Sequence, residues 1–390
     1  MIRLAGLFNS KAAKIIAGRN RMEKDLDRLD PNLKTVWFHC ASVGEFEQAL
    51  PLIRCIQEKY SRHQILVSFF SSSGYEFAQK KYPELIICYL PADLPGDMRS
   101  LIQRINPMIA IFIKYEFWFN LLTELKVRNV PTFLVSGIFR SSQVFFKFYG
   151  DFFRKGLQAF QHFFVQDEES AALLAGIGLK NVSISGDTRF DQVLFLKSQS
   201  FSNDVILDFK GDSKLFIAGS VWNSDIPVLV KIINLLPETF KVVLVPHEPS
   251  HFDISLLPGK PDLYSQTPRG DSRILILDTM GMLSKVYRWA SLVYVGGGFG
   301  KGIHNILEPA VFGVPILIGP NHRKFREALA LCKEEVAFAV EPEKIGDSDI
   351  QKWVGNEEFL AGLKARSDHY IAANTNVSAQ IAVFLNGYLS

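Results

Sequence analysis

The chain has 390 residues, 48% of them hydrophobic, four cysteines and a formal net charge of +3. This length predicts two or three domains of about 150 residues each, and the small net charge argues against a nucleic-acid partner, which would require a basic field. No CxxC pair is present, which favours a reducing, cytoplasmic setting, and no run of 18 apolar residues predicts a membrane-spanning helix.

The first 21 residues are basic and contain no acidic residue. Apolar residues recur among them at near-helical spacing, which is typical of an amphipathic helix that lies in a membrane interface. The alternative is a solvated first helix that packs on its own domain. We interpret residues 1–34 as a membrane-proximal segment, whose cations are Arg3, Lys11, Lys14, Arg19 and Arg21.

Short apolar runs alternate with amphipathic, helix-length segments through the rest of the chain. This alternation predicts parallel sheets covered by helices on both faces, and therefore an α/β protein with two Rossmann-like domains facing a cleft. We expect the first domain at residues 35–197, a polar linker at 198–204, and a second domain with C-terminal helices at 205–390. The strands are expected at residues 35–42, 65–71, 86–91, 108–114, 131–136, 162–166, 182–186, 214–220, 241–246, 273–278, 292–295 and 315–319.

Three charged residues of the first half follow expected strands, where parallel sheets bind ligands. Glu45 lies at a strand–glycine–helix junction and is either a proton acceptor or a helix cap. Glu116 lies among aromatic residues and is either a partly desolvated carboxylate or the polar start of a helix. Arg189 lies in a turn and is either an anion ligand or half of a local salt bridge.

The second half carries a glycine-rich loop, GGGFGKG, at residues 296–302, between an apolar strand and an expected helix. Glycines allow backbone amides to approach a ligand closely, and a helix N-terminus favours an anion. His304 follows this loop and His247 follows another expected strand. A lone histidine is usually structural, but two at strand ends of one domain indicate a binding site.

Two other features have competing interpretations. Asp25 and Asp27 have the DxD spacing of metal-dependent sugar transferases, but we interpret them as part of a solvated helix face, and no other cluster has the spacing of metal ligands. Residues 143–166 contain nine aromatic residues interleaved with Lys147, Arg154 and Lys155. We favour a buried helix and strand there over a lipid-binding surface.

Four motifs together resemble the 3-deoxy-D-manno-octulosonic acid (Kdo) transferases of lipid A biosynthesis. They are CASVGE at 40–45, KYEFWFN at 114–120, GDTRFD at 186–191 and HNILEP at 304–309, and they occur in the family's order. The aromatic variant KYEFW and the loop variant GFGKG resemble the branch found in Bacteroidetes-type bacteria.

The resemblance implies a GT-B fold and an inverting, metal-independent transfer of Kdo from CMP-Kdo to a lipid A precursor, lipid IVA, without a cofactor. It implies Glu45 as general base and Glu116 and Arg189 as transition-state stabilisers. It implies a location on the cytoplasmic side of the inner membrane, although the longer apolar anchor usual in the family is not seen here. The implied donor-binding residues are Ser220, Pro246, His247, Met280, Gly281, Met282, His304, Asn305, Ile306, Leu307 and Glu308.

Other functions fit parts of the same pattern. A different GT-B sugar transferase or a nucleotide-sugar epimerase would share the fold, and a non-catalytic nucleotide-binding protein at the membrane surface would share the glycine loop. The combination of Glu45, Glu116 and Arg189 argues against the binding protein, because binding alone does not need a base.

Overall fold

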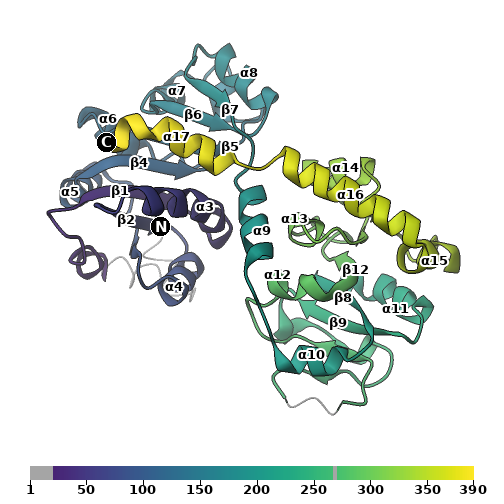
Figure 1. Ribbon diagram of the computed structural model, residues 1–390. Helices are drawn as coiled ribbons and strands as arrows, with labels where there is room; N and C mark the ends of the chain where they lie inside the picture. The colour runs from purple at the N-terminus through teal and green to yellow at the C-terminus, as the bar shows by residue number, and fades with distance from the viewer. Residues whose placement is uncertain (1–20, 267–269) are drawn as a thin grey trace. The chain divides into compact units, whose positions relative to one another are not determined.

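The computed structural model describes residues 21–266 and 270–390, which form two compact units (Figure 1). The first unit contains the residues up to Gln192 together with Asn374–Ser390, and the second contains Val193–Ala373. The chain therefore changes unit inside helix α9 (Arg189–Ser198), not in the expected linker at 198–204. The expected assignment of all residues 205–390 to one domain is also corrected, because the last helix belongs to the first unit.

The first unit is a parallel seven-stranded sheet in the order β3-β2-β1-β4-β5-β6-β7. Its strands are β1 (Lys34–Cys40), β2 (His63–Phe69), β3 (Ile86–Tyr89), β4 (Pro107–Ile113), β5 (Thr132–Gly137), β6 (His162–Val165) and β7 (Val182–Ile184). Its helices are α3 (Val43–Lys59), α4 (Ser72–Lys81), α5 (Pro95–Ile105), α6 (Phe119–Val127), α7 (Asp151–Leu157), α8 (Glu168–Gly176) and α17 (Val377–Leu389).

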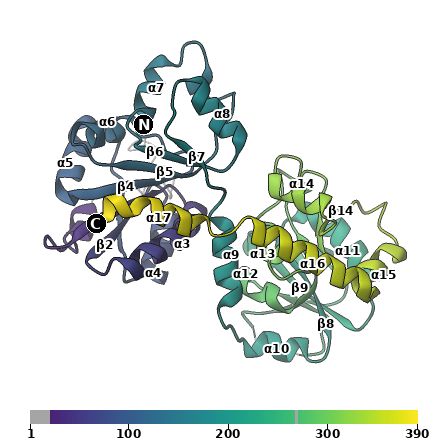
Figure 2. The same ribbon diagram turned by 45° about the horizontal axis from the view of Figure 1, so that its top comes forward.

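Both faces of this sheet are buried, which explains why strands such as β4 are continuous apolar runs. Helices α3, α4 and α17 contribute to the core on one face, and α5, α6 and α8 to the core on the other. Figure 2 shows α17 beside α3 on this unit, and α17 contacts α3 and β4. Val377, Ile381 and Leu385 of α17 are buried in that core, so burial of apolar surface fixes this helix to the first unit.

The second unit is also a parallel seven-stranded sheet, in the order β10-β11-β9-β8-β12-β13-β14. Its strands are β8 (Lys214–Val221), β9 (Phe240–Pro246), β10 (Asp262–Leu263), β11 (Ile274–Ile276), β12 (Ala290–Val295), β13 (Ile316–Ile318) and β14 (Ala337–Ala339). Its helices are α10 (Asp204–Lys210), α11 (Ile226–Leu235), α12 (Leu283–Val286), α13 (Leu307–Ala310), α14 (Arg326–Lys333), α15 (Asp347–Gly355) and α16 (Glu357–Ala373).

The expected α/β class with two Rossmann-like units is confirmed. Each of the twelve expected strands is present, with ends that differ by a few residues, and β10 and β14 were not expected. In each sheet the strand order reverses next to the first strand of the unit, between β1 and β4 and between β8 and β12. Such a reversal opens a crevice at the carboxyl ends of the two strands, where ligands bind in this class of fold.

Candidate functional site

In the first unit, the two carboxylates predicted from sequence lie on either side of this crevice. Glu45 is in the first turn of α3, directly after β1, and Glu116 follows β4. The N-cap of α3 is Ser42, whose side-chain oxygen accepts a hydrogen bond from the Glu45 N–H at 3.4 Å. A Cβ atom added to Gly44 would meet no atom within 4 Å, so the space beside the start of the helix is open.

The Glu45 carboxylate is nearly enclosed, with 7% of the residue exposed. Its Oε2 accepts a hydrogen bond from the Ala41 N–H at 2.5 Å, so the capping interpretation of Glu45 holds for this oxygen. Burial, followed by the negative charge of Glu116, raises the pKa of Glu45 to about 7. A carboxylate with such a pKa can take a proton at neutral pH, as general bases do.

Glu116 receives its contacts on one oxygen. Its Oε2 accepts a hydrogen bond from Trp118 Nε1–H at 2.8 Å and lies 3.6 Å from His39 Nε2. Among the described residues, Glu116 Oε1 has no hydrogen-bond partner. Trp118 is half-buried, and its indole N–H holds the carboxylate of Glu116 in place.

Arg189 is positioned by an ion pair with Asp187, a residue that is only 5% exposed. Arg189 Nε and Nη2 lie 2.8 and 2.6 Å from Asp187 Oδ2. The local salt bridge, one of the two interpretations of Arg189 from sequence, is therefore present. Burial raises the pKa of Tyr115, and the charges of Glu45, Arg189 and Glu116 all act on that pKa, so the three charged groups lie in the same neighbourhood.

Two residues at this edge have unusual backbone conformations. Lys114 and Ser136, at the ends of β4 and β5, have φ values of 64° and 55°. Non-glycine residues rarely adopt positive φ, and those that do are concentrated at functional sites. The charge of Lys114 lowers the pKa of Glu45, which opposes the effect of Glu116.

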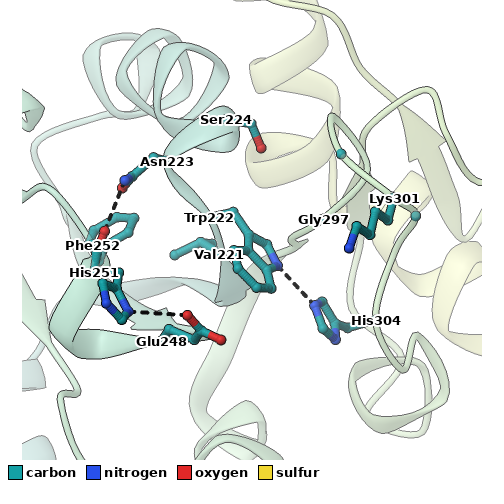
Figure 3. A pocket seen from close by; sticks show the side chains of 12 residues that line it. Val221, Trp222, Asn223, Ser224, Glu248, His251, Phe252, Gly297, Lys301 and His304 are labelled. Carbon is teal, nitrogen blue, oxygen red and sulfur yellow. Dashed lines mark hydrogen bonds and ion pairs between the residues drawn. The ribbon is translucent and has the colours of Figure 1, made fainter. Parts of the chain in front are cut away.

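The second unit has a cavity of about 480 Å³ at its own strand reversal (Figure 3). It lies between the segment after β8, the segment after β9 and the glycine loop after β12. Figure 3 shows Trp222 in the middle of the cavity lining. Lys301 of the glycine loop and His304, which follows the loop, lie on one side of Trp222, and Glu248 and His251, which follow β9, lie on the other. The cavity is lined by Val221, Trp222, Asn223, Ser224, Glu248, His251, Phe252, Gly297, Gly300, Lys301, Gly302 and His304.

The fully buried carboxylate of Asp225 links two segments of the cavity lining, the segment after β8 and the glycine loop. Its Oδ1 accepts a hydrogen bond from Tyr294 Oη–H at 2.8 Å. Its Oδ2 accepts hydrogen bonds from the N–H groups of Trp222 at 2.8 Å and Gly297 at 3.0 Å. Glycine is required in this loop because a Cβ atom at Gly296 would lie 2.4 Å from the Ser220 carbonyl oxygen.

His247 and His304 form a stack with Trp222. The two imidazole rings are 4.5 Å apart, and the Trp222 ring is 4.4 Å from that of His247. Trp222 Nε1–H donates to His304 Nε2 at 3.1 Å. Burial and the neighbouring His247 lower the pKa of His304 to about 4, so His304 is neutral at pH 7 and accepts this hydrogen bond.

The other predicted donor residues are more scattered than the motifs indicate. Of the predicted set, His304 alone is among the described residues that line the cavity. Met280 is 81% exposed in the loop after β11, next to Gly281 and Met282. The side chains of Ile306 and Leu307 are buried, as is Pro246, so these residues can offer a ligand little beyond their backbone groups.

The expected helix after the glycine loop is short. Helix α13 has four residues and begins at Leu307, after a segment without regular secondary structure. Asn305 Nδ2–H donates to Glu308 Oε1 at 3.0 Å, and Asn305 Oδ1 accepts from the Leu307 N–H at 3.2 Å. Ser220 ends β8 with a positive φ of 54°.

Several residues of the two sites were not singled out from sequence. They are His39, Ser68 and Asp187 in the first unit and Trp222, Asp225 and Lys301 in the second. Asp187 and Lys301 lie inside recognised motifs, so their motifs could have drawn attention to them. His39 and Ser68 come together only because β1 and β2 pair in the register that sets them opposite one another.

The DxD interpretation needs one correction. Asp25 is 5% exposed and accepts a hydrogen bond from Tyr75 Oη–H at 2.8 Å, so it is not part of a solvated face. Asp27 is exposed and pairs with Arg104 at 2.7 Å. Throughout residues 21–266 and 270–390, no three His, Cys, Asp or Glu side chains are grouped as a metal site would require.

Residues 1–20 of the expected membrane-proximal segment 1–34 lie outside the described residues, which begin at Arg21. Arg21 itself is 3.5 Å from Asp25. No helix in the described part of the chain has the length and apolar character needed to cross a membrane.

Comparison with known proteins identifies the first unit. Residues 16–192 match the family model described as 3-deoxy-D-manno-octulosonic-acid transferase (kdotransferase). The first unit of the chain is therefore similar to the Kdo transferases. Two curated members, named 3-deoxy-D-manno-octulosonic acid transferase, agree with this. The one from Chlamydophila psittaci is 27% identical over 299 residues, covering 73% of this chain and 69% of the relative. The one from Haemophilus influenzae is 27% identical over 326 residues, covering 78% and 75%.

A solved structure has the same fold as this chain. The UDP-GlcNAc 2-epimerase of Neisseria meningitidis bound to UDP-GlcNAc matches 90% of this chain and 100% of its own, with a TM-score of 0.63 and 13% identity. At that identity the likeness concerns the fold alone. The resemblance to the Kdo transferases is confirmed, and the Bacteroidetes-type branch stays a prediction.

Proposed function

We propose that this chain transfers Kdo from CMP-Kdo to a hydroxyl group of a lipid A precursor, lipid IVA, with inversion and without a metal ion. The observation that carries the proposal is that Glu45, Glu116 and Arg189 all lie near Tyr115, in a unit that matches the Kdo transferase model. The similarity to the Kdo transferases supports Kdo as the transferred sugar and a glycosyltransferase reaction.

In the proposed reaction, the acceptor hydroxyl oxygen forms a bond to the anomeric carbon of Kdo while the bond from that carbon to the CMP phosphate oxygen breaks. CMP leaves with the electron pair of that bond. Glu45 takes the hydroxyl proton, for which its raised pKa suits it. The guanidinium of Arg189 faces the carboxylate of Kdo, and Glu116 stabilises positive charge that develops on the sugar ring.

The second unit is proposed to hold CMP-Kdo. Its cavity at the strand reversal, the backbone amides of its glycine loop and the ammonium group of Lys301 suit an anionic nucleotide sugar. A neutral His304 contributes stacking and hydrogen bonding, not charge. We keep the eleven donor residues implied by the resemblance as proposed contacts and add Trp222 and Lys301 to them.

The direct test is to incubate the purified chain with CMP-Kdo and a tetraacylated lipid A precursor. The molecular mass of the lipid product is then measured by mass spectrometry. We expect the mass to increase by whole Kdo units, and we expect the same product in excess EDTA. Loss of product with EDTA and its return with Mg²⁺ would overturn the metal-free reaction. Turnover of UDP-GlcNAc instead of CMP-Kdo would favour an epimerase.

The pH dependence of the reaction is expected to follow Glu45. The carboxylate is the active form, so kcat/KM should fall as pH drops below about 7. In Glu116→Gln the negative neighbour that raises this pKa is gone, so the acidic limb should move to lower pH even though the maximal rate also falls. A pH–rate profile of both enzymes checks this, and an unmoved limb in Glu116→Gln would mean that another group is titrating.

A lipid acceptor also accounts for an unusual surface on the first unit. Phe148, Tyr149 and Phe152, which we name the aromatic ridge, are 94%, 60% and 68% exposed. The expectation of a buried segment at 143–166 holds for Phe145, Phe160, Phe163 and Phe164, but it is wrong for the ridge. Arg154 stiffens the ridge, because it donates to the carbonyl oxygens of Phe145 and Lys147.

We propose that the aromatic ridge enters the cytoplasmic face of the inner membrane, beside the lipid acceptor. Replacing all three residues with serine should weaken binding to anionic vesicles by about tenfold or more, because aromatic side chains contribute apolar area to interfacial binding. Vesicle flotation measures this. Leu256→Ser, which changes a residue of the second unit that is 56% exposed, is the control. Equal flotation of the triple variant and wild type would exclude the ridge from membrane binding.

A further inference from the structure

A buried histidine lies behind Glu116 and has no assigned role. His39, the next-to-last residue of β1, is 1% exposed and lies opposite Ser68 of β2 in the sheet. Its ring meets the rings of Phe112 and Trp118 edge-on, at centroid distances of 5.6 and 6.1 Å. Packing on two sides thus fixes the plane of this imidazole.

The hydrogen bonds of Ser68 determine which nitrogen of His39 carries the proton. Ser68 is fully buried, and its Oγ accepts a hydrogen bond from Trp37 Nε1–H at 2.9 Å. The same Oγ lies 2.8 Å from His39 Nδ1, and no other partner for the hydroxyl hydrogen is found among the described residues. The hydroxyl therefore donates to Nδ1, and in neutral His39 the proton is on Nε2.

The Nε2–H group points toward Glu116. It lies 3.6 Å from Glu116 Oε2 and, within the described residues, has no hydrogen-bond partner of its own. A buried donor without a partner is costly, and catalytic hydrogen bonds are often long before substrate binds and shorten in the complex. Trp118 holds the same oxygen at 2.8 Å, so a small movement of the carboxylate closes the remaining gap.

We propose that His39 is a positioning residue for Glu116: Trp37 and Ser68 fix its tautomer, and its Nε2–H holds Glu116 Oε2 so that Oε1 faces the reacting sugar. This inference rests on the proposed function. The same contact keeps a negative charge beside Glu45, and that charge raises the pKa of the proposed base. His39 thereby acts on both carboxylates without touching substrate.

Two substitutions separate positioning from packing. In His39→Asn the amide can still reach Ser68 but is too short to reach Glu116, whereas in His39→Gln the longer side chain can put an N–H group near the position of Nε2. We expect kcat to fall about 10- to 100-fold in His39→Asn and to recover to within about threefold of wild type in His39→Gln. KM for CMP-Kdo should change less than about twofold in both.

His162 offers a matched control, because its Nε2 lies 2.8 Å from Ser183 Oγ in the same sheet, on β6. His162→Asn removes a similar histidine–serine pair and should leave kcat unchanged. Thermal melting of every variant accompanies the kinetics. Equal kcat in wild type and His39→Asn overturns the inference, and so does an equal loss in the Asn and Gln variants, which would indicate packing alone. If the wild-type chain transfers no Kdo, the proposed function is overturned instead.

Discussion

Replacing Glu45 with glutamine is expected to lower kcat by about 10²–10⁴-fold, the usual contribution of a general base. The amide has nearly the shape of the carboxylate, and its oxygen can still accept the hydrogen bond from the Ala41 N–H that Glu45 Oε2 accepts now. The fold of the first unit should therefore persist, while the ability to take a proton at pH 7 is lost. Steady-state kinetics with CMP-Kdo and the lipid acceptor measure the loss.

Glu47→Gln is the matched control for this experiment. Glu47 lies in the same helix, α3, and burial raises the pKa of its carboxyl as well. Its side-chain charge interacts with Lys81, not with Glu116, so its loss should leave kcat within about threefold of wild type. Calorimetry with CMP should give wild-type affinity for both variants. Near-normal turnover by Glu45→Gln would remove Glu45 from the mechanism.

Replacing Asp225 with alanine is expected to destabilise the second unit by about 3–5 kcal/mol, because three buried donors lose their acceptor at once. Tyr294 Oη–H and the N–H groups of Trp222 and Gly297 all donate to this carboxylate. Two of these residues line the cavity, so affinity for CMP-Kdo should fall as well. Urea unfolding followed by tryptophan fluorescence measures the first effect, and calorimetry measures the second.

Asp253→Ala separates this effect from the general loss of a carboxylate. Asp253 accepts hydrogen bonds from the N–H and hydroxyl groups of Ser255 at 3.1 and 2.6 Å, but it is exposed. Water can replace it there, so we expect a loss of stability below about 1 kcal/mol. If Asp225→Ala unfolds at the same urea concentration as Asp253→Ala or at a higher one, the Asp225 carboxylate does not hold the glycine loop in place.

The sequence alone determined the fold class and the edge of each sheet that carries chemistry. Parallel strands buried on both faces must be continuous apolar runs, so segments such as 108–114 could be read directly. The residues that follow such runs must lie at the carboxyl edge. For this reason Glu45, Glu116 and His304 could be named as site candidates before their neighbours were known.

Tertiary structure decided which unit the last helix joins. The apolar residues of α17 predict a buried face but do not say which sheet buries it. Val377, Ile381 and Leu385 pack into the first unit, almost 200 residues from where that unit otherwise ends. Burial of apolar surface is non-directional, so periodicity alone cannot identify the partner.

Tertiary structure also decided the chemical state of the site residues. The pKa of Glu45 depends on burial and on Glu116, 71 positions later in the chain, and that of His304 depends on burial and on His247. His39 and Ser68 meet only through strand register, and Trp222 reaches His304 across two strands that are neighbours in the sheet. Electrostatic and hydrogen-bond energies depend on distance in space and on exclusion of water, neither of which the order of residues specifies.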